Sequence, residues 1–84
     1  MKMTDHVKKR ARQRGITVEA IRAALLWGFR TAVGGGKFCY FLGRREIACA
    51  LRQGVNVGKF LGVVVIATTN PVVITTYRVP PWEY

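Results

Sequence analysis

One stretch of the chain, residues 59–68, is almost wholly apolar and limits what the rest can fold into. A strand with one face in water alternates between apolar and polar residues, whereas a strand covered on both faces does not. The longest apolar run, residues 60–67, is far shorter than the ~18–20 residues that a membrane-spanning helix needs. We therefore expect residues 59–68 to form the central strand of a sheet in a protein that does not span a membrane.

A change in residue periodicity predicts the strands around it. From Thr31 apolar residues recur at every second position, which is typical of a strand, and three consecutive glycines at 34–36 predict a turn. The further strands predicted in this way are residues 37–43, 46–52 and 72–79. A tight turn at residues 43–45 would place Cys39 opposite Cys49 across a hairpin.

Two threonines predict the start of two helices. The hydroxyl of Thr4 or Thr17 can accept a hydrogen bond from a backbone N–H group of the following helical turn. The first helix is predicted over Asp5–Gln13, before Gly15, and the second follows Thr17. The residues predicted on the core side of the second helix are Ile21, Leu25 and Phe29.

This order of elements, helix, helix and then strands, predicts an α+β domain. The two N-terminal helices would pack on one face of a four- to five-stranded, mainly antiparallel sheet and leave the other face free for a site. A length of 84 residues allows one domain and excludes a multidomain enzyme. We expect an ordered core over about residues 4–79 and a tail over residues 80–84.

The charge balance limits the partners. The chain has 14 Lys and Arg residues against 4 Asp and Glu residues, a formal net charge of +10. Such a surface attracts phosphate backbones, anionic lipid or an acidic protein, and nucleic acid is the commonest of the three. Residues 1–15 are basic but have no apolar stretch behind them, so we expect no secretory signal and a cytoplasmic protein.

The residues that bind metals and form disulfides are few. Cys39, Cys49 and His6 form no Cys-x-x-Cys pair and no Cys/His quartet, and the carboxylates are scattered along the chain. We expect neither a metal nor a cofactor. The two cysteines are interpreted as small apolar residues in a reducing compartment, and a disulfide across the predicted hairpin is the alternative.

Three side chains in and directly after the first predicted helix form a polar stripe. His6, Arg10 and Arg14 are spaced four residues apart, so they lie along one side of a helix. An apolar stripe with the same spacing runs beside them and would face the core. The sequence therefore predicts an imidazole and two guanidinium groups next to the first helix's packing side.

These residues resemble a known pattern. His6, Arg10 and residues 14–17, then the glycines at 35–36 and the closing run at 73–78, are similar to a small family of uncharacterised domains near the BrnT and RelE/ParE toxins. The resemblance covers nearly the whole chain. It implies a RelE-like fold and a metal-independent endoribonuclease, the toxin of a toxin–antitoxin pair with an acidic antitoxin as its partner.

Metal-free RNA cleavage needs an acid or base and cations on the charged phosphorane. Histidine is the side-chain type that titrates near neutral pH, and His6 is the one histidine of the chain. Arg10 and Arg14 would clamp the phosphate. Thr75 and Tyr77, from the last predicted strand, would orient the phosphate or stack on a base.

Further basic and aromatic side chains would add affinity for RNA, free or ribosome-bound. These nucleic-acid-binding candidates are Lys8, Lys9, Arg12, Lys37, Tyr40 and Arg78. Two alternatives stay open at this point: a non-catalytic nucleic-acid-binding module and a protein-inhibitory module on the same fold. The first would bind RNA or DNA without cutting it, and the second would present its basic face to an acidic protein.

Overall fold

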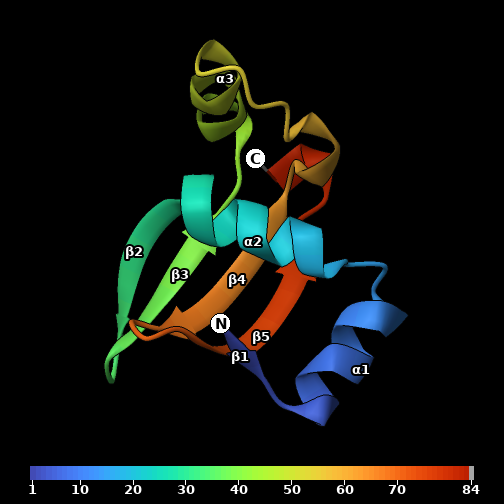
Figure 1. Ribbon diagram of the computed structural model, residues 1–84, viewed down its shortest axis with the longest axis vertical. Coiled ribbons are helices and arrows are strands. Elements are labelled where there is room, and N and C mark those ends of the chain that lie inside the picture. Colours follow the sequence, from blue (N-terminus) through green and yellow to red (C-terminus); the bar gives the residue numbers. More distant parts are fainter. Residues whose placement is uncertain (84) are drawn as a thin grey trace.

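The computed structural model describes residues 1–83, and within them the chain forms helices and one mixed sheet (Figure 1). The strands are β1 (Lys2–Met3), β2 (Phe29–Gly34), β3 (Lys37–Phe41), β4 (Val63–Thr68) and β5 (Val72–Arg78). Their order across the sheet is β1-β5-β4-β3-β2, with β1 parallel to β5 and the other pairs antiparallel. The α+β class predicted from the sequence is confirmed.

Strand β4 is the central strand, as its apolar sequence predicts. It pairs with β3 on one side and β5 on the other, and Val63, Val64, Val65 and Ala67 are all buried. The predicted start at residue 59 is wrong, because a 3-10 turn, Gly58–Phe60, precedes the strand. Gly62 has φ = +89°, a left-handed conformation that interrupts an extended chain, and β4 begins directly after it.

Both predicted helix starts are confirmed. The Val7 amide donates to Thr4 Oγ1 at 3.2 Å at the start of α1 (Asp5–Gln13). The Ala20 amide donates to Thr17 Oγ1 at 3.1 Å at the start of α2 (Val18–Trp27). The expected core position of Phe29 is wrong, since Gly28 takes an extended conformation, ends α2, and leaves Phe29 62% exposed at the start of β2.

The strand predicted over residues 46–52 is a helix, α3 (Arg44–Arg52). The Gly43 amide donates to Glu46 Oε1 at 3.2 Å, a contact that stabilises a helix start. Ile47 and Ala50 pack toward the core at helical spacing, whereas Leu51 is 59% exposed. The alternation in this segment is thus a coincidence of composition, and the helical period decides which residues are buried.

The predicted hairpin that pairs Cys39 with Cys49 is therefore wrong. In β3, Cys39 lies between Thr31 of β2 and Ile66 of β4, while Cys49 belongs to α3. Both thiols are free. The second neighbour of β3, on the side away from β4, is β2, the strand that follows Gly28.

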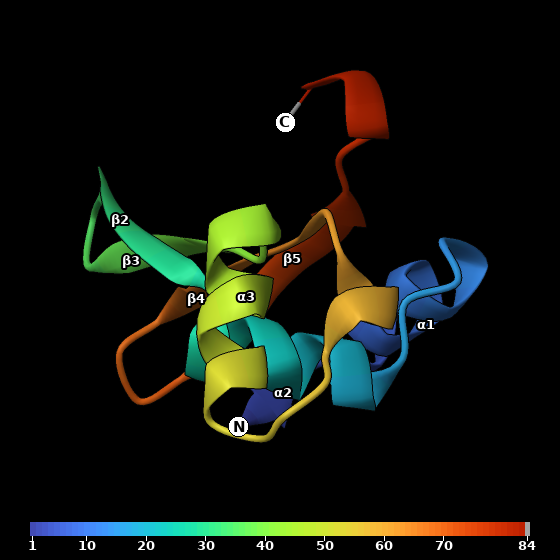
Figure 2. The same ribbon diagram turned by 90° about the horizontal axis from the view of Figure 1, so that it is seen from above.

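The hydrophobic core lies between the sheet and the first two helices. Val7 and Ala11 of α1 and Ile21 of α2 are buried in one cluster with Val65 of β4 and Val73 of β5. Seen from above, α1 and α2 lie on one side of the sheet, and the chain beyond β5 rises on the other (Figure 2). We call the sheet side away from α1 and α2 the outer face.

Candidate functional site

A groove runs between α1 and the edge of β5. Strand β1 pairs with β5 only at Val72 and Val73, so no strand covers that edge from Ile74 onward. Helix α1 packs there instead and buries Val7 and Ala11. We call the hollow along this contact the α1–β5 groove.

The α1–β5 groove brings the two ends of the chain together. Its volume is about 90 Å³, the space of roughly three water molecules. The residues that line it are His6, Val7 and Arg10 from α1 and Ile74, Thr75 and Thr76 from β5. His6 and Arg10, which carry an imidazole and a guanidinium, thus border a space suited to a small anion.

Arg14 lies beside this groove, directly after α1, and joins that helix to β5 by a hydrogen bond. Its Nη1 donates to the backbone carbonyl of Thr76 at 2.7 Å. The Thr76 hydroxyl in turn donates to the Val64 carbonyl at 2.8 Å and is buried. Arg14 does not line the groove, so its contact with β5 holds α1 in place and contributes a nearby positive charge.

Tyr77 lies apart from these residues. It is directly opposite Val64 in the sheet, and Val64 is directly opposite Phe41. Directly opposed residues share a face of a sheet, and the neighbouring core residue Val65 faces the helices. Tyr77 therefore belongs to the outer face, 39% exposed, and does not line the α1–β5 groove.

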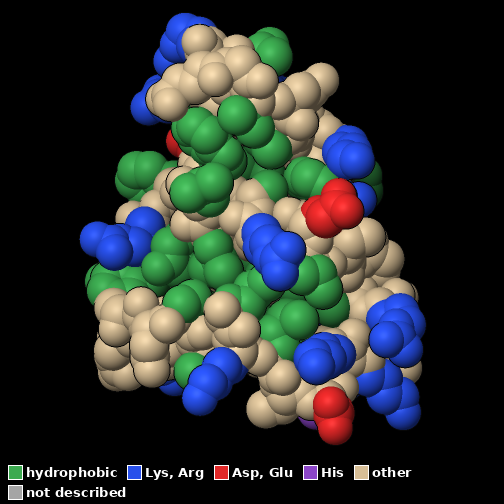
Figure 3. Space-filling model, in the orientation of Figure 1, with side chains coloured by type: hydrophobic (Ala, Val, Ile, Leu, Met, Phe, Trp, Pro, Cys, Tyr) green, Lys and Arg blue, Asp and Glu red, His purple; other side chains and the backbone are tan. Residues whose placement is uncertain are grey.

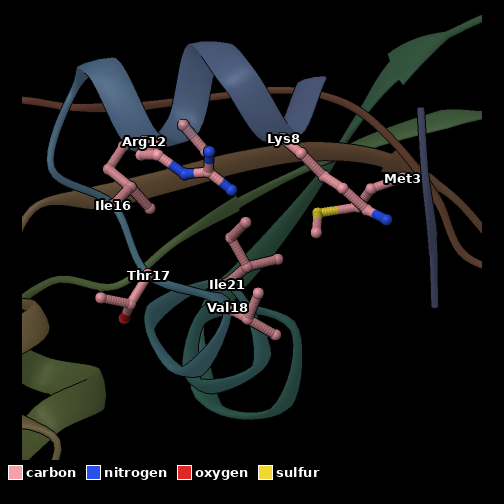
Figure 4. Close-up of a pocket in the computed structure, with 8 residues that line it drawn as sticks. Met3, Lys8, Arg12, Ile16, Thr17, Val18 and Ile21 are labelled. Atoms are coloured by element: carbon pink, nitrogen blue, oxygen red, sulfur yellow. The ribbon is translucent and has the colours of Figure 1, made fainter. Parts of the chain in front are cut away.

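Lys8 and Arg12 lie on another side of α1. They line a hollow of about 310 Å³ between α1 and α2, and its other lining residues include Met3, Ile16 and Ile21 (Figure 4). The two cationic side chains come from α1, while Ile21 comes from α2. This hollow is apolar within and basic at its α1 side.

The remaining expected binding residues are dispersed. Lys9 is exposed on α1, and Lys37 is exposed at the start of β3. Tyr40 is half-buried against the core, which limits its access to a base. Arg78 is exposed, and its Nη2 donates to the Lys59 carbonyl at 3.3 Å. Tyr84, the last residue of the predicted tail, lies outside the described residues.

Two further arginines, which the sequence analysis did not propose as binding residues, also contribute positive charge beside a hollow. Arg44 and Arg45, at the start of α3, line a hollow of about 410 Å³ with Phe29 and Phe41. The sequence signal for them was an adjacent arginine pair, which the misassigned turn concealed. On the α2 side, Lys and Arg side chains surround apolar ones that gather over α2, where Leu26 is 76% exposed (Figure 3).

The side chains that could bind a metal ion are dispersed in the described part of the chain. Among residues 1–83, no three His, Cys, Asp or Glu side chains gather where they could hold a metal ion. Burial raises the pKa of the Cys39 thiol above its ordinary value, so it remains protonated near neutral pH.

Of the described helices, none has the length and apolar character that crossing a membrane requires.

Comparison with known proteins identifies no relative: no protein family, curated protein or solved structure matches this chain.

Proposed function

We propose that this protein binds RNA and holds a backbone phosphate in the α1–β5 groove. The observation that carries the proposal is the meeting of His6 and Arg10 with Thr75 around one small hollow. A guanidinium can donate two parallel N–H bonds to phosphate oxygens. The groove therefore offers directed donors as well as charge.

The whole molecule supports an anionic partner. A net charge of +10 on 84 residues produces an attractive field around a phosphate backbone, and α1 carries the cations next to the groove. The α1 side chains Lys8, Lys9 and Arg12 lie outside the groove and add affinity that depends on salt but not on base sequence. The α1–β5 groove would then fix the position of one phosphate within a broad electrostatic contact.

The test is RNA binding measured over a range of salt concentrations. Arg10→Gln should weaken binding and lower the slope of log Kd against log salt by about 1, the effect of one lost phosphate contact. Arg22→Gln on α2 removes the same charge away from the groove and should leave that slope closer to wild type. Equal effects of the two substitutions would show that the α1–β5 groove has no special role.

RNA cleavage is a second candidate, and the position of His6 favours it. The chain's one histidine lines the groove in which a phosphate would sit, so it could move a proton to or from a ribose oxygen. Cleavage without metal fits the RelE-like toxin families that the sequence resembles. An acidic antitoxin in the cytoplasm would then be the expected protein partner.

Cleavage is tested with RNA, free and ribosome-bound, in the presence of a metal chelator. His6→Ala should lower the cleavage rate by about 100-fold or more, the usual scale for an acid–base group. Arg22→Gln, on α2 and outside the groove, is the control and should cleave at a near wild-type rate. RNA that stays intact with the wild-type protein would leave binding as the function.

A further inference from the structure

The outer face of the sheet carries a row of aromatic side chains. Phe29 of β2 is directly opposite Phe41 of β3, which is opposite Val64 of β4, which is opposite Tyr77 of β5. Directly opposed residues share a face, so the four side chains form one line across the sheet. Neighbouring strands are about 4.8 Å apart, and the row therefore extends about 14 Å from Phe29 to Tyr77.

The rings at the ends of this row are accessible. Phe29 is 62% exposed and Tyr77 is 39% exposed, whereas Val64 of β4, which lies between these two rings in the row, is only 3% exposed. The accessible rings thus lie at the two ends of the row, and the buried Val64 lies between them. Trp82 is a further exposed aromatic side chain, in the segment that rises on the outer-face side of the sheet (Figure 2).

Arginine side chains lie beside the row at one end. Phe29 and Phe41 line a hollow of about 410 Å³ together with Arg44 and Arg45 of α3. Glu46, the acidic residue of that lining, accepts a hydrogen bond from the Gly43 amide through Oε1. The hollow therefore combines two aromatic rings with two guanidinium groups.

We propose that Phe29 and Tyr77, at the two ends of this row, stack on bases of a single-stranded nucleic acid, with Arg45 on its phosphates. This inference rests on the proposed RNA-binding function and adds the form of the strand that binds. Every base has a π-face, so exposed rings next to cations bind single strands with little sequence preference. A duplex keeps its bases paired and stacked and cannot offer them to these rings.

Charge favours nucleic acid over a second copy of the chain on this surface. Two copies would each bring a net charge of +10, and the contact would place Arg44 and Arg45 near another basic protein. A phosphodiester strand brings one negative charge per nucleotide. The outer face is thus complementary in charge to a single strand.

The test compares a fluorescent single-stranded RNA with the same RNA annealed to its complement. Phe29→Leu keeps an apolar side chain but removes the ring, and should weaken single-strand binding by about fivefold or more. Phe29→Tyr keeps the ring and should bind as the wild type does. Tyr77→Leu is an independent variant of the same kind, and duplex binding should change little in each case.

The control is Leu26→Ala, which alters a highly exposed apolar side chain on α2, away from the outer face. It should bind both RNAs as the wild type does. Equal binding by wild type, Phe29→Leu and Tyr77→Leu would overturn the platform. So would a Phe29-dependent dimer in sedimentation, which would identify the outer face as an interface between copies.

The outcomes separate this inference from the proposed function. If Arg10→Gln weakens both RNAs while the ring variants change neither, the α1–β5 groove stands and the platform fails. If the ring variants weaken single-strand binding while Arg10→Gln changes nothing, the platform stands and the groove fails. If the wild type binds neither RNA, both proposals fail.

Discussion

At the scale of single residues, Arg14 was expected to bind a phosphate, but in the structure its guanidinium makes a hydrogen bond within the protein. Its guanidinium donates to the Thr76 carbonyl and so joins the end of α1 to the middle of β5. A guanidinium has five N–H donors, and this contact uses one of its nitrogens. Arg14 therefore contributes first to the shape of the α1–β5 groove and only through its charge to a ligand.

Arg14→Gln should lower the free energy of unfolding by about 1 kcal/mol, because a hydrogen bond from a charged donor is lost and the Thr76 carbonyl loses a partner. Urea unfolding measures the difference. Arg12→Gln removes a charge from the same helix and should cost less than about 0.5 kcal/mol. Equal destabilisation by both substitutions would assign the effect to charge alone.

Cys39 gives a pH-dependent prediction at the same scale. Burial raises its pKa in the folded protein, so the folded state holds the thiol proton more tightly than the unfolded state does. This contribution to stability is complete below the ordinary thiol pKa and is lost as pH rises through the raised value.

The measurement is alkylation in a Cys49→Ser background. Because only the thiolate reacts, alkylation of Cys39 in the folded protein should need a higher pH than in the chain unfolded by urea. The unfolded chain is the control for the reagent. Identical pH profiles in the two states would contradict the burial argument.

At the scale of elements, the chain's helix starts were predictable and its third helix was not. The Thr4 and Thr17 caps act within a few residues, so they can be read from the sequence. In α3 the residues Ile47, Cys49 and Leu51 alternate as a strand would. The helix forms because it packs Ile47 and Ala50 against the core. This is a tertiary contact, which the local residue pattern does not show.

The junction between α2 and β2 depends on Gly28. A Cβ atom at this position would collide with the Ala24 carbonyl oxygen and approach the Phe41 carbonyl carbon to 3.3 Å. Gly28→Ala should therefore destabilise the fold by about 1–3 kcal/mol, as overpacking does. Thermal unfolding would measure it, with Leu26→Ala as a control expected within about 0.5 kcal/mol of wild type. A stable Gly28→Ala variant would show that the junction can shift.

At the scale of the whole molecule, like charges lie close together. The radius of gyration is 12.1 Å and the net charge is +10, so many cations lie within about one Debye length of each other, roughly 10 Å at 0.1 M salt. Their repulsion opposes the folded state and weakens when salt screens it. The same charges that attract a phosphate backbone therefore limit the stability of the free protein.

The melting temperature should rise by a few degrees when sodium chloride increases from low to moderate concentration, because screening removes repulsion from the folded state. Scanning calorimetry measures the shift. An uncharged solute at equal osmolality is the control and should not reproduce the rise. A melting temperature that falls with salt would mean that attractive pairs outweigh the repulsion.

The sequence by itself determined what depends on near neighbours and on burial averaged over a segment. It predicted the two capped helices, the central position of β4 and the basic surface, since caps act over a single turn and a continuous apolar run requires cover on both faces. It also indicated that His6 and Arg10 lie on one side of a helix.

Only the tertiary structure decided which distant residues meet. His6 and Thr75 line one groove because β1 ends at Met3, opposite Val73, and leaves the rest of the β5 edge to α1. Phe29 joins Phe41 and Tyr77 because the chain leaves α2 at Gly28 and pairs β2 with β3. Strand order and register are set by the packing of the whole core, and no local pattern encodes them.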